Sequence, residues 1–297
     1  MSDSKLDVPL VTLNTGYKMP IVLFGTYKIT GQDDIDLAVD TALDAGYRGF
    51  DTAKYYKNEA EIGNALEKFL PKYGLKREDI FLITKFFPPA SNTEAEVDRL
   101  IQESLENLKT SFLDLVYVHY PKADEKSNDD PENFADRRDT YLALAKLKES
   151  GKIRSIGVSN FVLRHFQEIP KYSSVVPAAT QLEYHPHFTR NDIREHCKEQ
   201  GIYFQAFSSL GRHHPDLIGD PVVTEISQKH GVNPETVLLA FPLSQGIGIV
   251  PKSSNPDRIR GNFNAIRLKL SPEEIEKLNA RDKNQYYIRA HGWEVVT

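Results

Sequence analysis

Short runs of apolar residues alternate along the chain with longer segments in which apolar residues recur every three or four positions. The runs at 80–84 (IFLIT) and 113–118 (LDLVYV) are rich in β-branched and aromatic residues, so they predict buried strands. The segment between them, 93–108, has the spacing of an amphipathic helix, with leucine and isoleucine on its inner face. This alternation indicates repeated strand–helix units of about 30 residues each.

The same pattern extends over the whole chain and gives about eight such units. After a hairpin at 11–19, the expected strands are 20–27, one that ends at Asp51, 80–85, 113–119, 153–158, 179–182, 202–207 and 248–251. The expected helices are 33–45, 59–72, 93–108, 135–150, 162–169, 191–200, 222–230, 234–240, one near Asp257, and 271–278, with polar loops at 121–131 and 208–220. We therefore predict an α/β fold, a (β/α)8 TIM barrel in a single domain over residues 1–297, whose N-terminal β-hairpin closes the barrel bottom.

Composition narrows the class of protein without pointing to a function. Of the 297 residues, 40% are hydrophobic and 27% are charged, which is enough apolar material for a sizeable core. The formal net charge of −5 gives no basic excess that would attract nucleic acid or an anionic membrane. The single cysteine, Cys197, cannot form an internal disulfide, the N-terminus lacks the regions of a signal peptide, and no apolar run approaches the roughly 20 residues of a membrane span. We therefore expect a cytoplasmic protein.

Ionisable side chains stand at the ends of three successive predicted strands. The strand before Asp51 leads into a loop with Tyr55 and Tyr56, the next strand ends at Lys85, and the third ends at His119. Because ligands of parallel α/β folds bind at the carboxyl ends of the strands, we expect these side chains to face one shared opening at those ends. The first of the three segments would by itself equally suit a solvated loop in which an asparagine, Asn58, caps the next helix.

These residue types together suit acid–base chemistry on a carbonyl group. A lysine ammonium beside a tyrosine favours the phenolate, so we expect Lys85 to lower the pKa of the phenol from its ordinary value near 10. Asp51 would hold Lys85 charged and in position, and His119 would orient a substrate oxygen. Such a phenol could hand a proton to a developing alkoxide as a hydride reaches the carbonyl carbon. Tyr56 is our candidate acid, although the spacing does not separate it from Tyr55.

The last predicted strand leads into a segment that suits a phosphate group. The chain has no G-x-G-x-x-G fingerprint, so a Rossmann dinucleotide site has no support. In the segment 249–262 (IVPKSSNPDRIRGN), Lys252, Ser253 and Arg258 lie in a loop and a helix start, where barrels commonly bind phosphate. By itself, such a segment is more often a solvated basic turn.

Several longer motifs carry a resemblance to a known family over nearly the whole chain, from Val8 to Trp293. They are GYRGFDTAKYYKNEAEIG, LDLVYVHYP, GKIRSIGVSNF, QLEYHP and IVPKSSNPDRI. By these motifs the chain resembles the aldo-keto reductases. The resemblance implies a (β/α)8 barrel that uses NADPH to reduce aldehydes and ketones, without a metal. It also implies a catalytic tetrad with Tyr56, rather than Tyr55, as the general acid; the four residues are Asp51, Tyr56, Lys85 and His119.

The resemblance further implies how the nicotinamide end of NADPH is held. Ser159, Asn160 and Gln181 match positions that bind the nicotinamide carboxamide. Phe207 falls where the family usually stacks a tyrosine on the nicotinamide, so this chain keeps the aromatic face and loses a hydroxyl group.

For the other end of the cofactor, Lys252, Ser253 and Arg258 match the clamp on the adenosine 2′-phosphate, which favours NADPH over NADH. Gly261 stands where the family commonly has a glutamate near the adenine, so we expect cofactor affinity or release to differ. The remaining candidate cofactor contacts fall into three groups. Gly25 and Thr26 lie at the end of the first strand, and Asp51 lies at the end of its neighbour. Ser208 and Leu210 match contacts to the pyrophosphate, and Asn262 matches a contact to the adenine.

The candidate substrate contacts are His119 and two aromatic residues. Tyr27 and Tyr120 occupy positions often filled by tryptophan in the family, which implies a less bulky and more polar pocket. The loop 211–220 and the tail after Arg281 look shorter than in many vertebrate members, so we expect an open site with a broad aldehyde preference. We also expect a small-molecule carbonyl substrate and a monomeric protein.

Two other functions are open at this point. Some relatives bind a nicotinamide cofactor mainly to serve a partner, as potassium-channel β subunits do, which would make this chain a cofactor-binding regulatory subunit. Alternatively, the chain would be a Schiff-base lyase that uses Lys85, if burial lowers the pKa of Lys85, although Asp51 opposes this by holding the charge.

Other residues suggest chemistry only weakly. The pairs His185–His187 and His213–His214 lack a third ligand at a sensible spacing, and such pairs are more often surface histidines, so we predict no metal site. Cys197 is expected to be a bystander on a helix. Trp293 is expected to be either a packing residue or part of the pocket rim.

Overall fold

Eight parallel strands form one sheet in which each strand pairs with its neighbours in chain order. The computed structural model of the chain describes residues 8–288. Bridges from Val22 to Ile249 and from Gly25 to Lys252 join the first strand to the last, so the sheet closes on itself. The predicted (β/α)8 barrel is therefore confirmed. The strands are β3 (Phe24–Gly25), β4 (Gly49–Asp51), β5 (Phe81–Phe86), β6 (Leu113–Val118), β7 (Ile153–Ser159), β8 (Ala179–Glu183), β9 (Tyr203–Phe207) and β10 (Gly248–Ile249).

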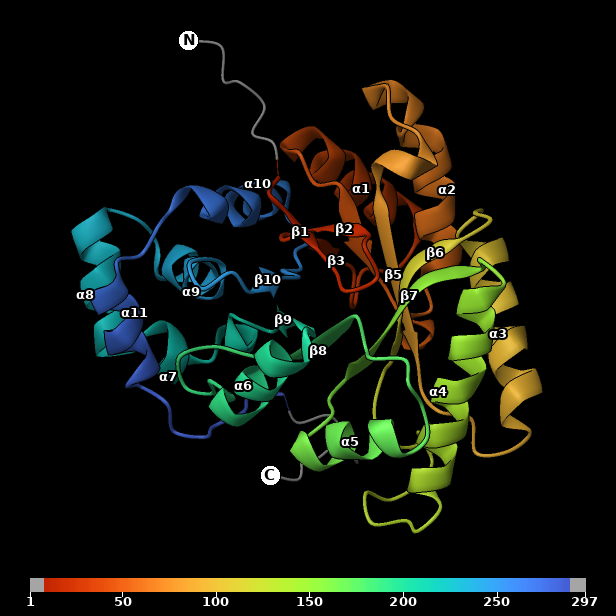
Figure 1. Cartoon of the computed structure of the whole chain (residues 1–297). Helices are drawn as coiled ribbons and strands as arrows, with labels where there is room; N and C mark the ends of the chain where they lie inside the picture. The colour runs from red at the N-terminus through yellow and green to blue at the C-terminus, as the bar shows by residue number, and fades with distance from the viewer. Residues whose placement is uncertain (1–7, 289–297) are drawn as a thin grey trace.

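Helices surround the strands, as Figure 1 shows. Most of them follow a strand and return the chain to the barrel bottom, which is the alternation that the apolar pattern predicts. The helices are α1 (Gln32–Ala45), α2 (Glu59–Phe69), α3 (Thr93–Asn107), α4 (Asn133–Glu149), α5 (Leu163–Glu168), α6 (Asn191–Gln200), α7 (Pro215–Ile218), α8 (Pro221–His230), α9 (Pro234–Leu243), α10 (Pro256–Asn264) and α11 (Pro272–Asn279).

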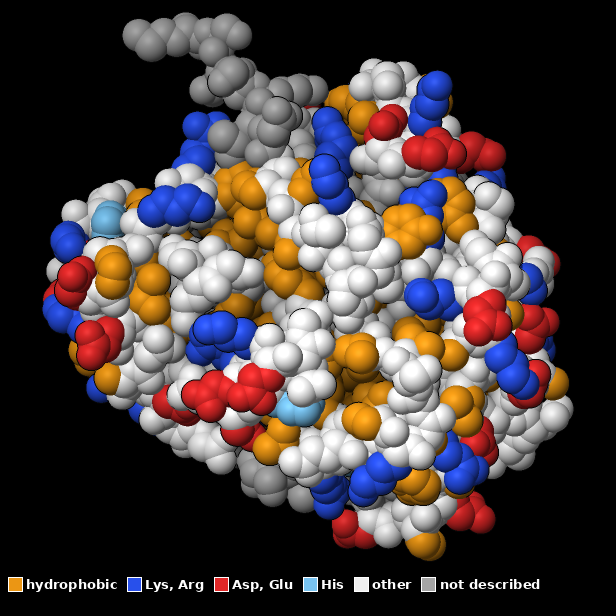
Figure 2. All heavy atoms as spheres, viewed as in Figure 1, with side chains coloured by type: hydrophobic (Ala, Val, Ile, Leu, Met, Phe, Trp, Pro, Cys, Tyr) orange, Lys and Arg blue, Asp and Glu red, His pale blue; other side chains and the backbone are white. Residues whose placement is uncertain are grey.

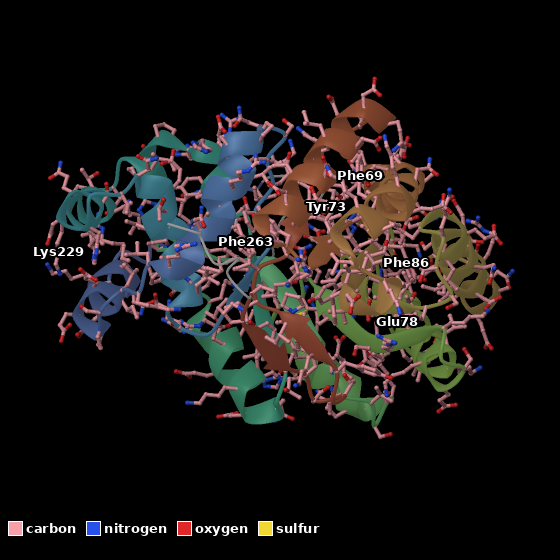
Figure 3. The ribbon with its side chains drawn as sticks, turned by 90° about the horizontal axis from the view of Figure 1, so that it is seen from above. Phe69, Tyr73, Glu78, Phe86, Lys229 and Phe263 are labelled. Carbon is pink, nitrogen blue, oxygen red and sulfur yellow. The ribbon has the colours of Figure 1, made fainter. Side chains whose placement is uncertain are left out.

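The main hydrophobic core lies between the strands and this ring of helices. Phe263 of α10 packs against Tyr47 with ring centroids 4.8 Å apart, and both side chains are buried. In Figure 3, Phe263 lies well inside the molecule, whereas Lys229 of α8 projects at its outer edge. Hydrophobic side chains also gather in the middle of the face drawn in Figure 2, with charged side chains of both signs around them.

The predicted N-terminal hairpin closes the barrel bottom. It consists of β1 (Leu10–Thr12) and β2 (Lys18–Pro20), which pair antiparallel. Met19 is fully buried and belongs to a second core cluster with Phe81 and Leu115, which lie in the first halves of β5 and β6. The hairpin therefore covers the end of the barrel opposite the carboxyl ends of the strands, so within residues 8–288 the carboxyl end is the one that is open for a ligand.

The structure differs from the predicted elements at several boundaries. The strand predicted over 20–27 is reduced to β3, because only two of its residues pair with β4. The helix predicted to end at residue 72 stops at Phe69, and Pro71 begins a separate 3-10 turn. The loop predicted over 208–220 contains α7. Within residues 8–288, no helix is both long and apolar enough to cross a membrane.

Candidate active site

A cavity of about 900 Å³ opens at the carboxyl ends of the barrel strands. Every residue that the sequence analysis proposed for catalysis, cofactor or substrate lines this cavity, with the exception of Lys85, which is fully buried beneath its wall. The lining residues among those proposed are Gly25, Thr26, Tyr27, Asp51, Tyr56, His119, Tyr120, Ser159, Asn160, Gln181, Phe207, Ser208, Leu210, Lys252, Ser253, Arg258 and Asn262.

A buried ion pair lies at the floor of the cavity. The Lys85 amine donates to a carboxylate oxygen of Asp51 over 2.6 Å and to the backbone oxygen of Thr52 over 2.9 Å. Burial lowers the pKa of the Lys85 ammonium, and the charge and hydrogen bond of Asp51 oppose that effect. The other carboxylate oxygen of Asp51 accepts from the Gln181 amide over 2.8 Å. Both oxygens of the buried carboxylate thus have partners, which is what a charge held away from water requires.

The Tyr56 phenol contacts this ion pair and also lines the cavity. The Lys85 amine lies 3.4 Å from the phenol oxygen, on the donor side of a long hydrogen bond. We expected Lys85 to lower the pKa of the phenol, and the net direction is the opposite. Burial raises the pKa of Tyr56 well above its ordinary value, and the charges of Asp51 and Tyr27 act in the same direction. The phenol therefore keeps its proton at neutral pH, as a proton donor must.

The backbone that carries Tyr56 is tied to the neighbouring strand ends by Asn58. Tyr56 ends a 3-10 turn, η1 (Lys54–Tyr56), and Lys57 after it has a positive φ of 54°. The Asn58 amide donates to the backbone oxygens of Thr26 and Ile29, both over 3.0 Å, and its oxygen accepts from the hydroxyl group of Thr52 over 2.7 Å. Asn58 is fully buried and does not cap α2 with its side chain. The solvated, helix-capping interpretation of this segment is therefore wrong.

His119 lies beside Tyr56, directly after the end of β6. Its ring stands 5.9 Å from the Tyr56 ring in an edge-on arrangement and stacks on Phe87 with a centroid distance of 4.9 Å. Burial lowers the pKa of His119 well below its ordinary value, and the positive charge of Lys85 acts in the same direction. The imidazole is therefore neutral at neutral pH and can present one N–H group to a substrate oxygen.

Polar residues also stand at the ends of β7 and β9. The Asn160 amide donates to the backbone oxygen of His119 over 2.9 Å and to the Ser159 hydroxyl over 3.2 Å. Asn160 has a φ of 60°, and Ser208 after β9 has a φ of 53°, so both hold the left-handed conformation that side chains other than glycine rarely adopt. Such conformations often mark functional sites, where they direct side chains or backbone groups at a ligand.

The far end of the cavity is lined by cations. Lys252 and Arg258 come from the segment after β10, and Lys28 joins them from the loop after β3. Within residues 8–288, none of the three makes an ion pair with a carboxylate, and the positive charges of Lys28 and Arg258, after burial, lower the pKa of Lys252. The Arg258 guanidinium donates to the Ser253 hydroxyl over 3.3 Å, at the start of α10. This end of the cavity suits a dianionic phosphate group.

The structure adds residues to the cavity that the sequence analysis did not propose. Lys28 directly follows Tyr27, so its charge beside a strand end was a signal that could have been used. Glu183 ends β8, and Ile288 reaches the same cavity from the end of the described chain. Tyr55 also lines it, beside Tyr56. The contribution of Ile288 has no local sequence signal, because it depends on where the chain crosses the barrel.

The histidine pairs have protein partners or lie in solvent. His185 and His187 are fully buried, so the expectation of surface histidines is wrong for this pair, whereas His213 and His214 are exposed. Among residues 8–288, no group of three or more His, Cys, Asp or Glu side chains could hold a metal ion. Cys197 is buried on α6, and burial raises the pKa of its thiol to about 12. Trp293 lies outside the described residues.

Comparison with known proteins connects this site to one family. The profile of the Aldo/keto reductase family matches residues 22–214 and 217–283. The chain is 34% identical over 275 residues to glyoxal reductase of Bacillus subtilis (strain 168), with 93% of each chain covered. It is 34% identical over 296 residues to aldo-keto reductase family 1 member A1 of Mus musculus, covering 94% of this chain and 90% of the relative. Among solved structures, Bombyx mori aldo-keto reductase in complex with NADP has 30% identity, a TM-score of 0.87 and 97% of both chains covered.

Proposed function

The chain belongs to the aldo/keto reductase family, and from this premise we propose that it reduces aldehydes and ketones to alcohols with NADPH, using Tyr56 as the general acid. Members of this family are oxidoreductases that use a nicotinamide cofactor. The observation that carries the proposal is the chain of buried contacts from Asp51 through Lys85 to Tyr56 at the wall of a large cavity.

Tyr56 supplies the proton in this proposal. NADPH, when bound, would supply the hydride that the carbonyl carbon of the substrate receives. As negative charge develops on the carbonyl oxygen, the O–H bond of Tyr56 breaks and its proton moves to that oxygen, which gives the alcohol. The raised pKa of Tyr56 keeps the phenol protonated until this charge develops.

The other three residues support the proton transfer. The Lys85 amine, 3.4 Å from the phenol oxygen, stabilises the phenolate that the transfer leaves behind. Asp51 holds that amine in place over 2.6 Å and compensates its charge in a buried position. His119 is neutral and donates a hydrogen bond that orients the carbonyl oxygen towards Tyr56.

The lining of the cavity fits NADPH along its length. Lys252, Arg258 and Ser253 would hold the 2′-phosphate, because this uncompensated cluster of cations favours a dianion. The amide and hydroxyl groups of Ser159 and Asn160 would hold the nicotinamide carboxamide. In the structure Gln181, the third residue proposed for that contact, donates to Asp51, so its oxygen is the atom that would face the cofactor.

The substrate end of the cavity is walled by aromatic rings. Tyr27 packs against Tyr56 with ring centroids 5.0 Å apart, and Tyr55 and Tyr120 line the same region. Such rings offer an apolar surface with polar edges and suit small aldehydes and ketones without strong selection among them. We therefore propose a broad preference for aldehydes.

The test is a comparison of kcat/KM for a panel of aldehydes, ketones and sugars with NADPH and with NADH. We expect NADPH oxidation with at least one class of aldehyde and a lower kcat/KM with NADH. Tight NADPH binding without turnover of any carbonyl would overturn the proposal and would favour the cofactor-binding regulatory subunit. Trapping of a substrate on Lys85 by borohydride would instead favour a Schiff-base enzyme.

A further inference from the structure

The wall of the substrate cavity includes a segment from the far end of the chain. After α11 the chain crosses the carboxyl end of the barrel, and Ile288 lines the same cavity as Tyr56 and His119. The segment 281–288 contains no helix or strand, so the regular backbone hydrogen bonds of such an element do not hold it there. Its position therefore depends on contacts with the barrel.

The carboxylate of Glu183 makes the central contact. Its oxygens accept from the backbone N–H groups of Tyr287 over 2.6 Å and of Ile288 over 3.2 Å. The ring of His185 lies 2.9 Å from the same carboxylate. Glu183 ends β8 and is 2% exposed, so its orientation is fixed by the barrel rather than by solvent. One buried charge thus holds two adjacent backbone groups at the point where the segment reaches the cavity.

A second buried group holds the same segment from the other side. The backbone oxygen of His187 accepts from the N–H groups of Lys283 over 3.2 Å and Gln285 over 2.9 Å. The ring of His187 lies 2.7 Å from the Tyr287 hydroxyl and 2.9 Å from the Asp220 carboxylate. Asp220 also accepts from the Arg281 guanidinium over 2.9 Å. Residues 183–187 therefore hold the segment 281–288 along most of its length.

We propose that Glu183 is a positioning residue that holds Tyr287 and Ile288, fixes the part of the cavity wall that Ile288 forms, and thereby sets substrate affinity. The proposal rests on the carbonyl reductase function proposed above, because affinity is defined by that substrate. Ile288, which Glu183 holds in the cavity wall, contributes no group to the proton transfer. Its loosening therefore weakens substrate binding equally before and during the reaction, which raises KM and leaves kcat less affected.

The test is the Glu183→Gln variant. An amide of the same shape keeps one acceptor oxygen but turns an NH2 group towards backbone donors, so at least one of the two N–H groups loses its partner. We expect faster hydrogen exchange of the amides of Tyr287 and Ile288, by about tenfold or more. We also expect KM for aldehydes to rise at least about threefold, with a smaller change in kcat and an unchanged Kd for NADPH.

Glu274→Gln is the matched control. Glu274 is buried to a similar degree and accepts from Lys229 and His230 over 2.6 and 2.9 Å, on α11, where it lines no part of the cavity. This variant removes a buried carboxylate of comparable burial, so we expect a loss of stability while KM and exchange at Tyr287 and Ile288 stay as in the parent. If Glu183 had a purely structural role, Glu183→Gln would behave like Glu274→Gln: it would lose stability but keep the KM and the exchange rates of the parent.

A second variant keeps the proposal testable if Glu183→Gln does not fold. Tyr287→Phe removes only the hydroxyl group that contacts His187, on a half-buried side chain, and we expect a smaller shift in the same two measurements. Unchanged exchange and unchanged KM in both variants would overturn the proposal. If the parent protein reduces no carbonyl compound, the proposed function fails and the role in substrate affinity fails with it, whereas the exchange measurement still decides whether Glu183 holds the segment.

Discussion

The amine of Lys85 lies 2.6 Å from the carboxylate of Asp51, and both side chains are almost entirely removed from solvent. The two residues come from neighbouring strands, β4 and β5, 34 positions apart in the sequence. Their charges compensate each other, so the pair can stay ionised beside the Tyr56 phenol in a place where a single charge would be costly. The ionised ammonium is then available to stabilise a phenolate at Tyr56.

Replacement of Tyr56 tests its role as the proton donor. We expect Tyr56→Phe to lower kcat/KM for aldehyde reduction by about 10²–10⁴-fold, because the ring remains and only the transferable proton is lost. The Kd for NADPH should stay within about twofold of the parent, since no contact of the phosphate end is removed. The matched control is Tyr55→Phe, on an exposed neighbour, which should keep most of the activity. Undiminished turnover by Tyr56→Phe would refute the assigned role.

Removal of one member of the buried ion pair should cost stability as well as activity. In Lys85→Met the charge of Asp51 stays buried without its partner, so we expect the free energy of unfolding to fall by about 3–5 kcal/mol. Addition of Asp51→Asn should restore part of that stability without restoring turnover. In Lys68→Met, which breaks an exposed pair with Asp36, the loss should stay below about 1 kcal/mol. Urea unfolding measures all three, and equal losses at the two lysines would contradict the inferred strength of the buried pair.

The cation cluster at the far end of the cavity should decide the choice of cofactor. We expect Lys252→Met to raise the Kd for NADPH by about tenfold or more, which corresponds to the loss of a charge-assisted hydrogen bond. The Kd for NADH, which lacks the 2′-phosphate, should change by less than about twofold. Fluorescence titration with both cofactors measures this difference. Arg260→Met on the same helix, α10, removes an exposed cation that pairs with Asp44 and should leave both constants unchanged. An equal loss of affinity for the two cofactors would show that Lys252 does not contact the 2′-phosphate.

Buried histidines should make the fold sensitive to acid. Burial, with the charges of Arg137 and Arg164, lowers the pKa of His165 to about 3, below the ordinary value of about 6.5 expected in the unfolded chain. Between these values the unfolded chain binds a proton that the folded chain does not, so the free energy of unfolding falls as the pH falls from about 6.5 towards 3. Urea unfolding between about pH 7 and pH 4 should show this slope.

The variant His165→Asn should make that slope shallower, because it removes one such proton and keeps an acceptor for the N–H group of Val162. His119 and His187 also have lowered pKa values, so part of the slope should remain. A parent-like slope in His165→Asn would mean that His165 takes up its proton in the folded state.

The fold class and the general place of the site follow from the amino-acid sequence alone. Alternating β-rich runs and amphipathic segments admit few arrangements other than a parallel barrel, because each segment has a face or faces to bury and short connections to its neighbours. Strand ends of such a barrel converge on one opening, so Asp51, Tyr56 and His119 could be assigned to a common site from their positions at those ends.

Properties that depend on the surroundings of each group became visible only in the folded chain. The convergence of strand ends places Tyr56 near Lys85, but the pKa of the phenol depends on how far the fold removes it from water, and that burial outweighs the ammonium. Likewise, His185 and His187 look like surface residues until the chain crosses back over them, and Glu183 shows no partner until Tyr287 and Ile288, more than a hundred residues later, reach it. The hydrophobic period and the secondary-structure propensity of a segment depend on a few neighbouring residues. Desolvation and long-range hydrogen bonds arise only when distant segments pack together.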